Sequence, residues 1–234
     1  MAKQKPFQFK QFSLAHSRSA QKIGTDSVIL GSWLKAEKAD TILDVGSGCG
    51  LLAFMMAQKF PQAQVLGIEL DLVSFEESLE NCTHSPFKER VSFIQSDFTQ
   101  WSRQTLFDLI VSNPPYFESG QNTERPARDN ARRQKSLSHA ILLKQMSQLL
   151  TKTGSIYLVL PPFEADNFID LAHKEGLYLA RFCEVKSKAD SATKRCLFSL
   201  SRQASRTQNE ELILYSEDGS RHPQHAKLTH DFYL

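Results

Sequence analysis

A glycine-rich turn in this sequence has the spacing of a ligand-binding loop. Gly46, Gly48 and Gly50 stand in "LDVGSGCG", a G-x-G-x-G pattern that leads directly into a predicted helix. Glycines let a ligand approach the backbone closely, and the start of a helix offers it free amide groups. The turn therefore indicates a ligand-binding site.

Acidic side chains around this turn indicate the kind of ligand. Asp44 precedes the glycines, and a carboxylate there repels a pyrophosphate but suits a cationic or zwitterionic ligand. Glu69 ends the next apolar run, at roughly the distance where such folds accept hydrogen bonds from a ribose. Asp97 ends a third run and is followed by Phe98, so a carboxylate for an exocyclic amine stands beside a ring for a purine. A nucleoside with a zwitterionic, sulfonium-bearing tail would satisfy all of these positions.

The main alternative is the dinucleotide fingerprint G-x-G-x-x-G, which binds a pyrophosphate. Here the third glycine, Gly50, comes one residue too early for that pattern. The sequence also lacks a catalytic Lys/Tyr or His constellation. A nicotinamide oxidoreductase is therefore disfavoured.

A fourth apolar run, residues 107–111, ends in "SNPPY", residues 112–116. Pro114 and Pro115 explain why a strand stops there, because proline has no backbone donor for the next hydrogen bond of a sheet. They do not explain the polar Asn113 or the aromatic Tyr116. These two side chains predict that the strand end holds a ligand.

The elements that position these residues alternate along the chain. Short apolar runs rich in β-branched residues predict strands, and the segments between them predict helices. The predicted strands are 41–46, 64–70, 91–97, 107–113 and 155–161, and the predicted helices are 25–34, 51–60, 72–81, 138–150 and 163–176. Strands that are apolar throughout and separated by helices predict an α/β fold with a parallel sheet covered on both faces.

The end of the chain departs from this alternation. Residues 177–185 and 194–202 have no helix between them, so they should pair as antiparallel strands at a sheet edge. A last short pair is expected between residues 210–216 and 228–234. The predicted helix at 25–34 begins with Thr25 and Asp26, whose residue types are common at an N-cap.

Composition excludes several classes of protein. Of 234 residues, 41% are hydrophobic and 23% charged, which is ordinary for a globular protein, and a net charge of +2 does not by itself indicate a nucleic-acid partner. The four cysteines form no Cys-x-x-Cys pair, so we predict neither a metal site nor a disulfide framework. No signal peptide and no apolar stretch near the ~20 residues of a membrane span are present. We expect a cytoplasmic protein without a membrane partner.

The segments "LDVGSGCG", "GIEL", "QSDF" and "SNPPY", in this order, resemble the class I S-adenosylmethionine-dependent methyltransferases. The resemblance implies a Rossmann-like fold with a seven-stranded, mostly parallel sheet, an antiparallel edge hairpin and helices on both faces. It implies S-adenosyl-L-methionine as the cofactor. The residues that would bind it are Asp44, Gly46, Gly48, Gly50, Glu69, Asp97, Phe98 and Asn113.

In that family, an Asn-Pro-Pro-aromatic motif marks methylation of a nitrogen attached to a planar, conjugated group. Such an amine is a poor nucleophile, and two acceptors, the Asn113 side-chain oxygen and the Pro114 carbonyl, would favour the form with a free lone pair. Pro114 and Pro115 would hold these acceptors rigidly, and Tyr116 would stack on the substrate ring. The motif leaves DNA adenine, RNA adenine, RNA guanine and protein glutamine open.

Basic residues narrow the substrate class. The long connection after Tyr116 contains "ERPARDNARRQK", whose arginines form a basic rim where a phosphate backbone would lie. The terminal hairpin adds further cations. We predict contacts to tRNA from Arg125, Arg128, Arg132, Arg133, Lys194 and Arg195.

Both ends of the chain carry a closer resemblance. "AQKIGTDSVILGSW" and "LTHDFYL" look like the bacterial tRNA1(Val) adenine-37 N6-methyltransferase family, which implies methylation of adenine N6 beside the anticodon. By this resemblance, Lys22, Gly24, Thr25 and Asp26 would cap the cofactor pocket near the methionine end or the target base, and Lys22 and Thr25 join the cofactor-binding residues. The chain departs from the family at Ser27, where a small residue or glycine is expected.

We accordingly divide the chain into an N-terminal extension with a capping helix, residues 1–40, and a catalytic domain, residues 41–234. Together they should form one globular unit that acts as a monomer without an obligate protein partner. Two alternatives stay open. A release-factor glutamine methyltransferase would usually carry a separate N-terminal helical domain, whereas this chain begins its fold within ~40 residues. A non-catalytic RNA-binding module has no need of a full cofactor pocket.

Overall fold

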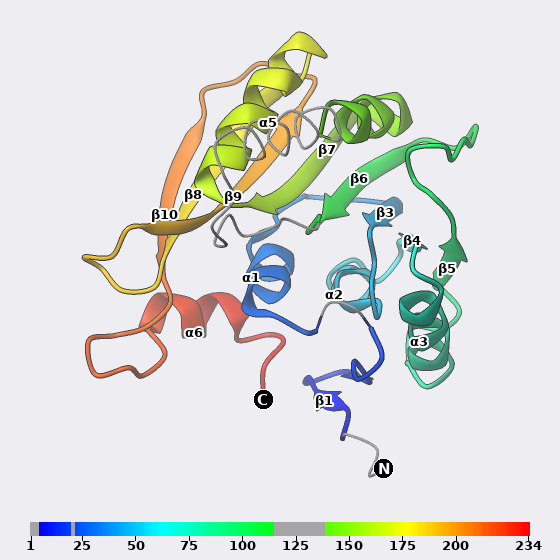
Figure 1. Cartoon of the computed structure of the whole chain (residues 1–234), viewed down its shortest axis with the longest axis horizontal. Helices are drawn as coiled ribbons and strands as arrows, with labels where there is room; N and C mark the ends of the chain where they lie inside the picture. Colours follow the sequence, from blue (N-terminus) through cyan, green and yellow to red (C-terminus); the bar gives the residue numbers. More distant parts are fainter. Residues whose placement is uncertain (1–4, 20–21, 115–138) are drawn as a thin grey trace, which may run out of the picture.

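The computed structural model describes residues 5–19, 22–114 and 139–234. Within these ranges the main sheet has eight strands in the order β10-β8-β9-β7-β6-β3-β4-β5 (Figure 1). Their bounds are β3 (Thr41–Val45), β4 (Gln64–Glu69), β5 (Val91–Gln95), β6 (Phe107–Ser112), β7 (Leu150–Leu160), β8 (Tyr178–Lys186), β9 (Thr193–Ser201) and β10 (Gln208–Ile213). The α/β class is confirmed, but the predicted number of seven strands was wrong, because β10 adds an eighth.

The strand order creates a switch point beside β3. From β3 the chain adds β4 and then β5 on one side, and β6 returns to the other side of β3, all in parallel. In such sheets, ligands bind outside the carboxyl ends of the strands where the winding reverses. Val45 and Ser112 are partners across this point, and the Ser112 hydroxyl donates to the Val45 carbonyl at 2.7 Å. The glycine-rich turn and Asn113 therefore emerge at the same corner.

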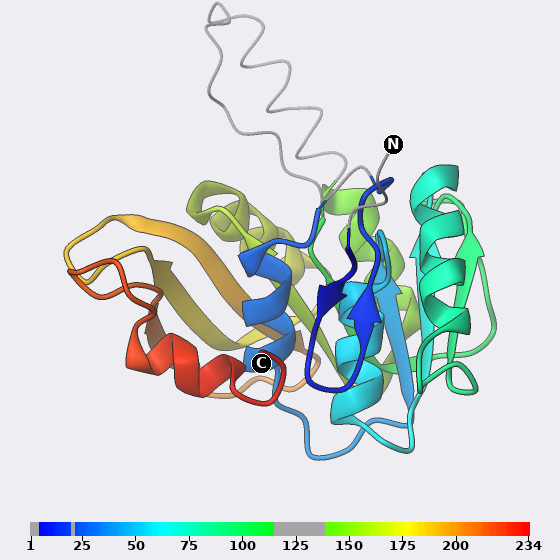
Figure 2. The same cartoon turned by 90° about the horizontal axis from the view of Figure 1, so that it is seen from below.

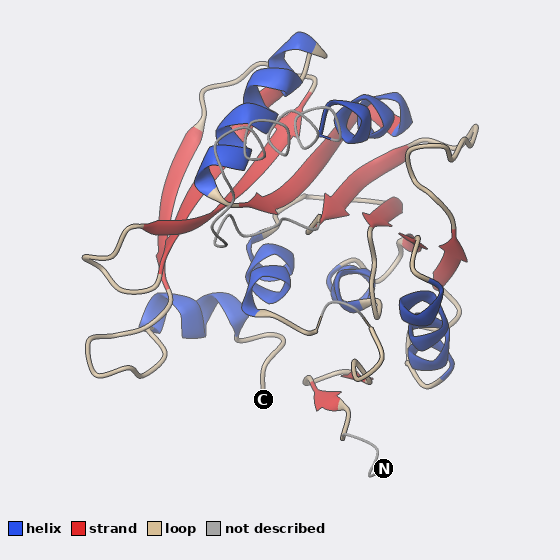
Figure 3. Ribbon diagram, viewed as in Figure 1, coloured by secondary structure: helices blue, strands red, loops and turns tan. Residues whose placement is uncertain are grey.

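Helices cover both faces of the sheet, as predicted (Figure 3). One face carries α1 (Thr25–Trp33), α2 (Leu51–Lys59) and α3 (Leu72–Thr83), and the other carries α5 (Pro162–Lys174) and a helix at residues 139–149. Each face has its own hydrophobic cluster, with Phe54 buried in the first and Phe168 in the second. Burial on both sides explains why the central parallel strands β3, β4 and β6 are largely apolar.

The C-terminal part corrects two predictions. β8 and β9 pair antiparallel as predicted, but β8 is not an edge strand, because β10 pairs with it in parallel. The tail at 228–234 does not pair with 210–216. Instead, α6 (Pro223–Thr229) forms and contacts α1. His222 at its N-cap and Pro223 at its first position suit a helix start.

The N-terminal segment packs against α2. Strands β1 (Phe7–Gln8) and β2 (Ser13–Leu14) form a small hairpin in front of α2 (Figure 2), and the rings of Phe12 and Phe54 lie 5.9 Å apart. At α1 the N-cap is Gly24, not Thr25 or Asp26 as predicted; both lie in the first turn. In the ranges given above, no helix is both long and apolar enough to cross a membrane.

Candidate active site

The glycine-rich turn follows β3 and is tied to β4. The backbone amides of Gly46 and Ser47 donate to the Ile68 carbonyl at 2.9 and 3.0 Å. Gly46 and Gly48 have φ values of +72° and +53°, which side chains rarely adopt. A Cβ built at either position would meet nothing within 4 Å, so this side of the turn is open to a ligand.

Gly50 has a different role from the other two glycines. It is the N-cap of α2, with φ +94°, and a Cβ there would lie 2.7 Å from the rings of Phe54 and Phe93. The rings fill the place of a side chain, so this glycine permits close packing at the helix start. Whether its backbone also contacts the cofactor stays a prediction.

Asp44 is fully buried beneath the turn. Its Oδ2 accepts a hydrogen bond of 2.9 Å from the Ala53 amide in the first turn of α2. Burial raises the pKa of this carboxyl to about 8, against the lowering effect of the Ala53 hydrogen bond and with a further raising effect of the Glu69 charge. The other oxygen, Oδ1, has no hydrogen-bond partner in the described structure. A positively charged ligand group would favour the ionised form.

Glu69 links the glycine-rich turn to the loop after β4. Its Oε2 accepts from the Gly48 amide at 2.7 Å, and its Oε1 accepts from the Asp71 amide at 2.9 Å. The side chain is half-buried. Each carboxylate oxygen can accept a second hydrogen bond, so a pair of hydroxyl groups could still bind here.

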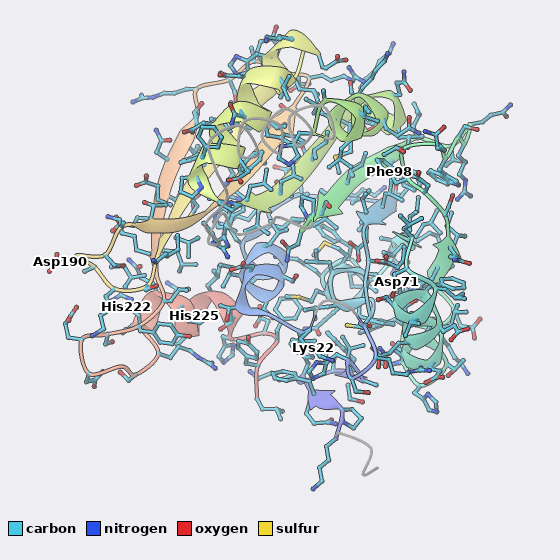
Figure 4. All side chains as sticks on the ribbon, viewed as in Figure 1. Lys22, Asp71, Phe98, Asp190, His222 and His225 are labelled. Carbon is cyan, nitrogen blue, oxygen red and sulfur yellow. The ribbon has the colours of Figure 1, made fainter. Side chains whose placement is uncertain are left out.

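Asp97 and Phe98 follow β5. Asp97 is exposed, and its Oδ1 accepts from the amide and the hydroxyl of Thr99 at 2.9 and 2.7 Å. Phe98, labelled in Figure 4, is only 7% exposed and belongs to the cluster under the helix at 139–149. Its ring therefore contributes mainly to the core, and its contact with a purine stays a prediction.

Asn113 directly follows β6 and is 6% exposed. Its Nδ2 donates to the Ser27 hydroxyl of α1 at 2.9 Å. Its Oδ1 is buried and has no partner among the residues described. Pro114 is buried beside it. Asn113 thus presents an unused acceptor at the switch point.

Several predicted site residues lie outside the described residues: Pro115, Tyr116, Arg125, Arg128, Arg132 and Arg133. The predicted cations of the hairpin are described. Lys194 is exposed, whereas Arg195 donates from Nε to Asp26 Oδ2 at 2.8 Å. Arg195 is therefore tied to α1, and a direct contact with tRNA stays a prediction for both residues.

Lys22 is exposed and anchored by the segment before it. Its Nζ donates to the carbonyls of His16 and Ser17 at 3.1 and 2.6 Å, and Figure 4 shows it near the N-terminal hairpin. Thr25 opens α1. The two residues lie on the same segment as Ser27, but their contact with the cofactor is untested.

Two polar residues of α3, which were not predicted, hold the N-terminal segment. Asn81 bonds both backbone groups of Ala15 at 2.8 Å and donates to the Cys49 carbonyl at 2.9 Å. Glu77 accepts from the amides of Arg18 and Ser19 at 3.1 and 2.8 Å. Burial opposes its ionisation, but the Ser19 hydroxyl and these amides outweigh it and hold its pKa below the ordinary value.

A signal for these contacts existed in the sequence, although it is weak. Helix α3 buries Ser74, Glu77, Ser78 and Asn81 and exposes apolar side chains such as Leu72 and Leu79. A helix whose apolar residues do not form one stripe has a polar face available for contacts. Nothing in the sequence showed which backbone that face would bind.

Asp44 Oδ1, Ser47 Oγ and Asn113 Oδ1 are buried polar atoms without partners within the described ranges. They belong to β3, to the glycine-rich turn and to the residue that follows β6. Buried polar atoms in folded proteins normally have partners. An anionic acceptor and an amide acceptor fit a ligand with a positive charge and hydrogen-bond donors. In a doubly wound α/β fold this site defines a methyltransferase that uses a sulfonium nucleoside.

Comparisons with known proteins agree with this class. Residues 11–165 match the methyltransferase small domain family. The fold is similar to that of a protein described as a predicted O-methyltransferase from Agrobacterium tumefaciens, with a TM-score of 0.69, 17% identity and coverage of 88% of this chain and 96% of that one.

Curated relatives are closer in sequence. The tRNA1(Val) (adenine(37)-N6)-methyltransferase of Vibrio campbellii is 38% identical over 230 residues, 98% of this chain and 96% of the relative. The enzyme of that name from Pasteurella multocida is 40% identical over 236 residues, 100% of this chain and 98% of the relative. The chain belongs to the tRNA1(Val) (adenine(37)-N6)-methyltransferase family.

The cofactor is S-adenosyl-L-methionine, which supplies an electrophilic methyl group on a sulfonium. The residues at the switch point fit it. Asp44 would face its positive charge, Glu69 its ribose hydroxyls and Asp97 its adenine amine. The open sides of Gly46 and Gly48 leave room for it to approach the backbone.

Proposed function

We propose that this chain methylates N6 of an adenine in tRNA, at position 37 of tRNA1(Val). Its relatives carry this activity in their names. The observation that carries the proposal is the Asn113 Oδ1 atom, which is buried, without a partner in the described chain, and placed beside the glycine-rich turn. An oxygen in this position can accept a hydrogen bond from an exocyclic amine.

The residues of the chain would act by positioning. Asn113 Oδ1 and the Pro114 carbonyl accept the two hydrogens of the amine, which localises the lone pair on nitrogen. Holding that lone pair in line with the methyl group lowers the entropic part of the barrier. Tyr116 would stack on the base. The methylated nitrogen is acidic, so its proton can leave to water without a dedicated base.

We further propose that residues 1–40 act as an extension that caps the catalytic domain at 41–234, and that the protein works as a cytoplasmic monomer. Support comes from Phe9, Phe12 and Phe232, which share one hydrophobic cluster with Phe54 of α2. Sedimentation of the purified protein with and without tRNA tests the oligomeric part. A single species at the mass of one chain is expected, and a stable dimer would contradict it.

The activity can be tested with labelled S-adenosylmethionine and bulk tRNA from a strain that lacks this enzyme. Digestion should yield labelled N6-methyladenosine. Asn113→Ala should abolish transfer and largely keep cofactor affinity, because the amide contacts the substrate amine. Label on protein glutamine, with none on tRNA, would overturn the proposal in favour of a glutamine methyltransferase.

A further inference from the structure

The first turn of α1 contacts the end of β6 through one side-chain pair. Ser27 and Asn113 are 86 positions apart, and the Asn113 Nδ2 donates to the Ser27 Oγ at 2.9 Å. Asn113 is almost fully buried, and within the part of the chain described this is the hydrogen bond its side chain makes. Ser27 therefore determines which way the amide faces.

The direction of this amide matters for the reaction. The terminal torsion of asparagine is broad and roughly two-fold, so a rotation exchanges the oxygen and the nitrogen at nearly equal shape. Only the oxygen can accept a hydrogen bond from the substrate amine. If the side-chain nitrogen of Asn113 took the position of the oxygen, its N–H group would face the N–H of the substrate amine, and no hydrogen bond could form. An acceptor that binds Nδ2 removes this wrong orientation.

We propose that Ser27 is a positioning residue for methyl transfer, which orients Asn113 so that its Oδ1 faces the target amine. The inference rests on the proposed acceptor role of Asn113. Ser27 acts through its hydrogen bond with Asn113.

A second contact fixes the turn that carries Ser27. Asp26 accepts from Arg195 Nε at 2.8 Å, with side-chain exposures of 24% and 20%. Such half-buried, hydrogen-bonded pairs hold geometry better than exposed ones. Arg195 lies near the start of β9, which pairs with β7, the neighbour of β6. The first turn of α1 is thus held between two strands of the sheet, and Arg195 supports Ser27 through Asp26.

The test compares two serines of the same helix. Ser27→Ala removes the acceptor, whereas Ser32→Ala removes a buried hydroxyl that has no partner in the described structure. Loss of one hydrogen bond of ~1 kcal/mol predicts a kcat about threefold to tenfold lower for Ser27→Ala. The KM for tRNA and the Kd for S-adenosylmethionine should change less than about twofold, since one positioning contact is lost and no ligand contact. Ser27→Thr should restore kcat, and Ser32→Ala should match wild type.

Two measurements separate this role from a structural one. The side-chain amide resonances of Asn113, assigned by their loss in Asn113→Asp, should shift in Ser27→Ala and stay in place in Ser32→Ala. Arg195→Gln should lower kcat in the wild-type background. It should not lower kcat further in the Ser27→Ala background, because both substitutions act on the side-chain amide of Asn113. A tRNA contact of Arg195 would instead raise the KM for tRNA in both backgrounds.

An unchanged kcat in Ser27→Ala, or a Ser27→Thr variant as slow as Ser27→Ala, would overturn the inference. So would a loss of activity explained by a weaker Kd for S-adenosylmethionine. The proposed function is judged separately, by whether the wild-type enzyme methylates tRNA at all. The Ser27 comparison is judged by the ratio of variant to wild type.

Discussion

Glu69 binds the backbone amide of Gly48 at 2.7 Å, so the acid predicted to bind the ribose also shapes the glycine-rich turn. Its second oxygen accepts from the Asp71 amide at 2.9 Å, in the loop that leads into α3. One carboxylate therefore joins the glycine-rich turn and the loop after β4, which are predicted to bind the cofactor. Gly48 and Glu69 were both predicted as cofactor-binding residues, but their direct contact was not predicted.

Glu69→Gln should weaken cofactor binding strongly. Glutamine has one acceptor oxygen, so its NH2 group would face one of the two backbone donors, and a charge-assisted hydrogen bond of ~1.5–3 kcal/mol would be lost. We expect the Kd for S-adenosylmethionine to rise at least about tenfold in calorimetric titration. Glu76→Gln, an exposed acid on α3, is the matched control and should bind like wild type. Equal affinity of Glu69→Gln and wild type would contradict this role.

Gly48→Ala and Gly50→Ala should fail in different ways. At Gly48 a Cβ meets no protein atom, so beyond about 1 kcal/mol of backbone strain the fold should tolerate it, while the methyl group projects toward the cofactor space. At Gly50 a Cβ would overlap the rings of Phe54 and Phe93 at 2.7 Å.

Urea unfolding should therefore show Gly50→Ala as the less stable of the two, by about 1–3 kcal/mol of added overpacking. For each variant, the loss of cofactor affinity can be divided by the loss of stability. This ratio should be larger for Gly48→Ala than for Gly50→Ala. The reverse ranking would mean that the open side of the turn does not face the cofactor.

Asp44 should make the cofactor-free protein less stable as the pH rises. Its folded pKa is about 8, above the ordinary value of 3.8, so between these values the folded state holds a proton that the unfolded chain releases. Stability from this group is full below pH ~4 and is lost as the pH rises toward 8, with a slope of up to ~1.4 kcal/mol per pH unit.

Asp44→Asn keeps an acceptor for the Ala53 amide and removes the titration. Urea unfolding from pH 5 to 8 without cofactor should thus give a flatter profile for Asp44→Asn than for wild type. The variant should also bind S-adenosylmethionine more weakly, because it lacks the carboxylate that is predicted to face the positive charge of the cofactor. Parallel pH profiles of the two proteins would show that Asp44 is already ionised in the free enzyme.

Asn81 should couple the N-terminal segment to the glycine-rich turn. Asn81→Ala removes three hydrogen bonds, two to Ala15 and one to Cys49, and leaves buried backbone groups unpaired. We expect a loss of about 1–3 kcal/mol in unfolding free energy and faster limited proteolysis near residues 15–19, which cofactor slows in wild type. Glu80→Gln removes only an exposed 2.6 Å ion pair with Arg18 and should show neither effect. Equal proteolysis of both variants would rule out the coupling.

Most strands of the sheet could be predicted from the sequence, whereas the side-chain contacts that orient the site residues could not. The runs at β3, β4 and β6 are largely apolar on both sides, and a parallel sheet fixes where their ends meet. The sequence pattern therefore predicted that Asp44, Glu69 and Asn113 lie at one edge of the sheet. β10 was missed as a partner of β8 because edge pairing depends on the whole sheet. Residues 115–138 lie outside the described structure, so the predicted roles of Tyr116 and the basic loop stay predictions.

The contacts made by Ser27, Asn81 and Arg195 could not be predicted because each joins segments far apart in the sequence. A serine in a helix start, an asparagine on a helix and an arginine near a strand start are ordinary residues in ordinary places. Their partners are a buried amide, a backbone loop and an acid on α1. These residues and their partners meet only in the packed fold, and the periodicity of the sequence does not predict such contacts.

The most direct test of the account uses two transcripts of tRNA1(Val) that differ at one base. One carries adenine and the other guanine at position 37, the position in the names of the relatives. With wild-type enzyme and labelled S-adenosylmethionine, we expect one methyl group per adenine-37 transcript, recovered as N6-methyladenosine, and none on the guanine-37 transcript. Equal labelling of both transcripts, or labelling of neither, would contradict the proposed target.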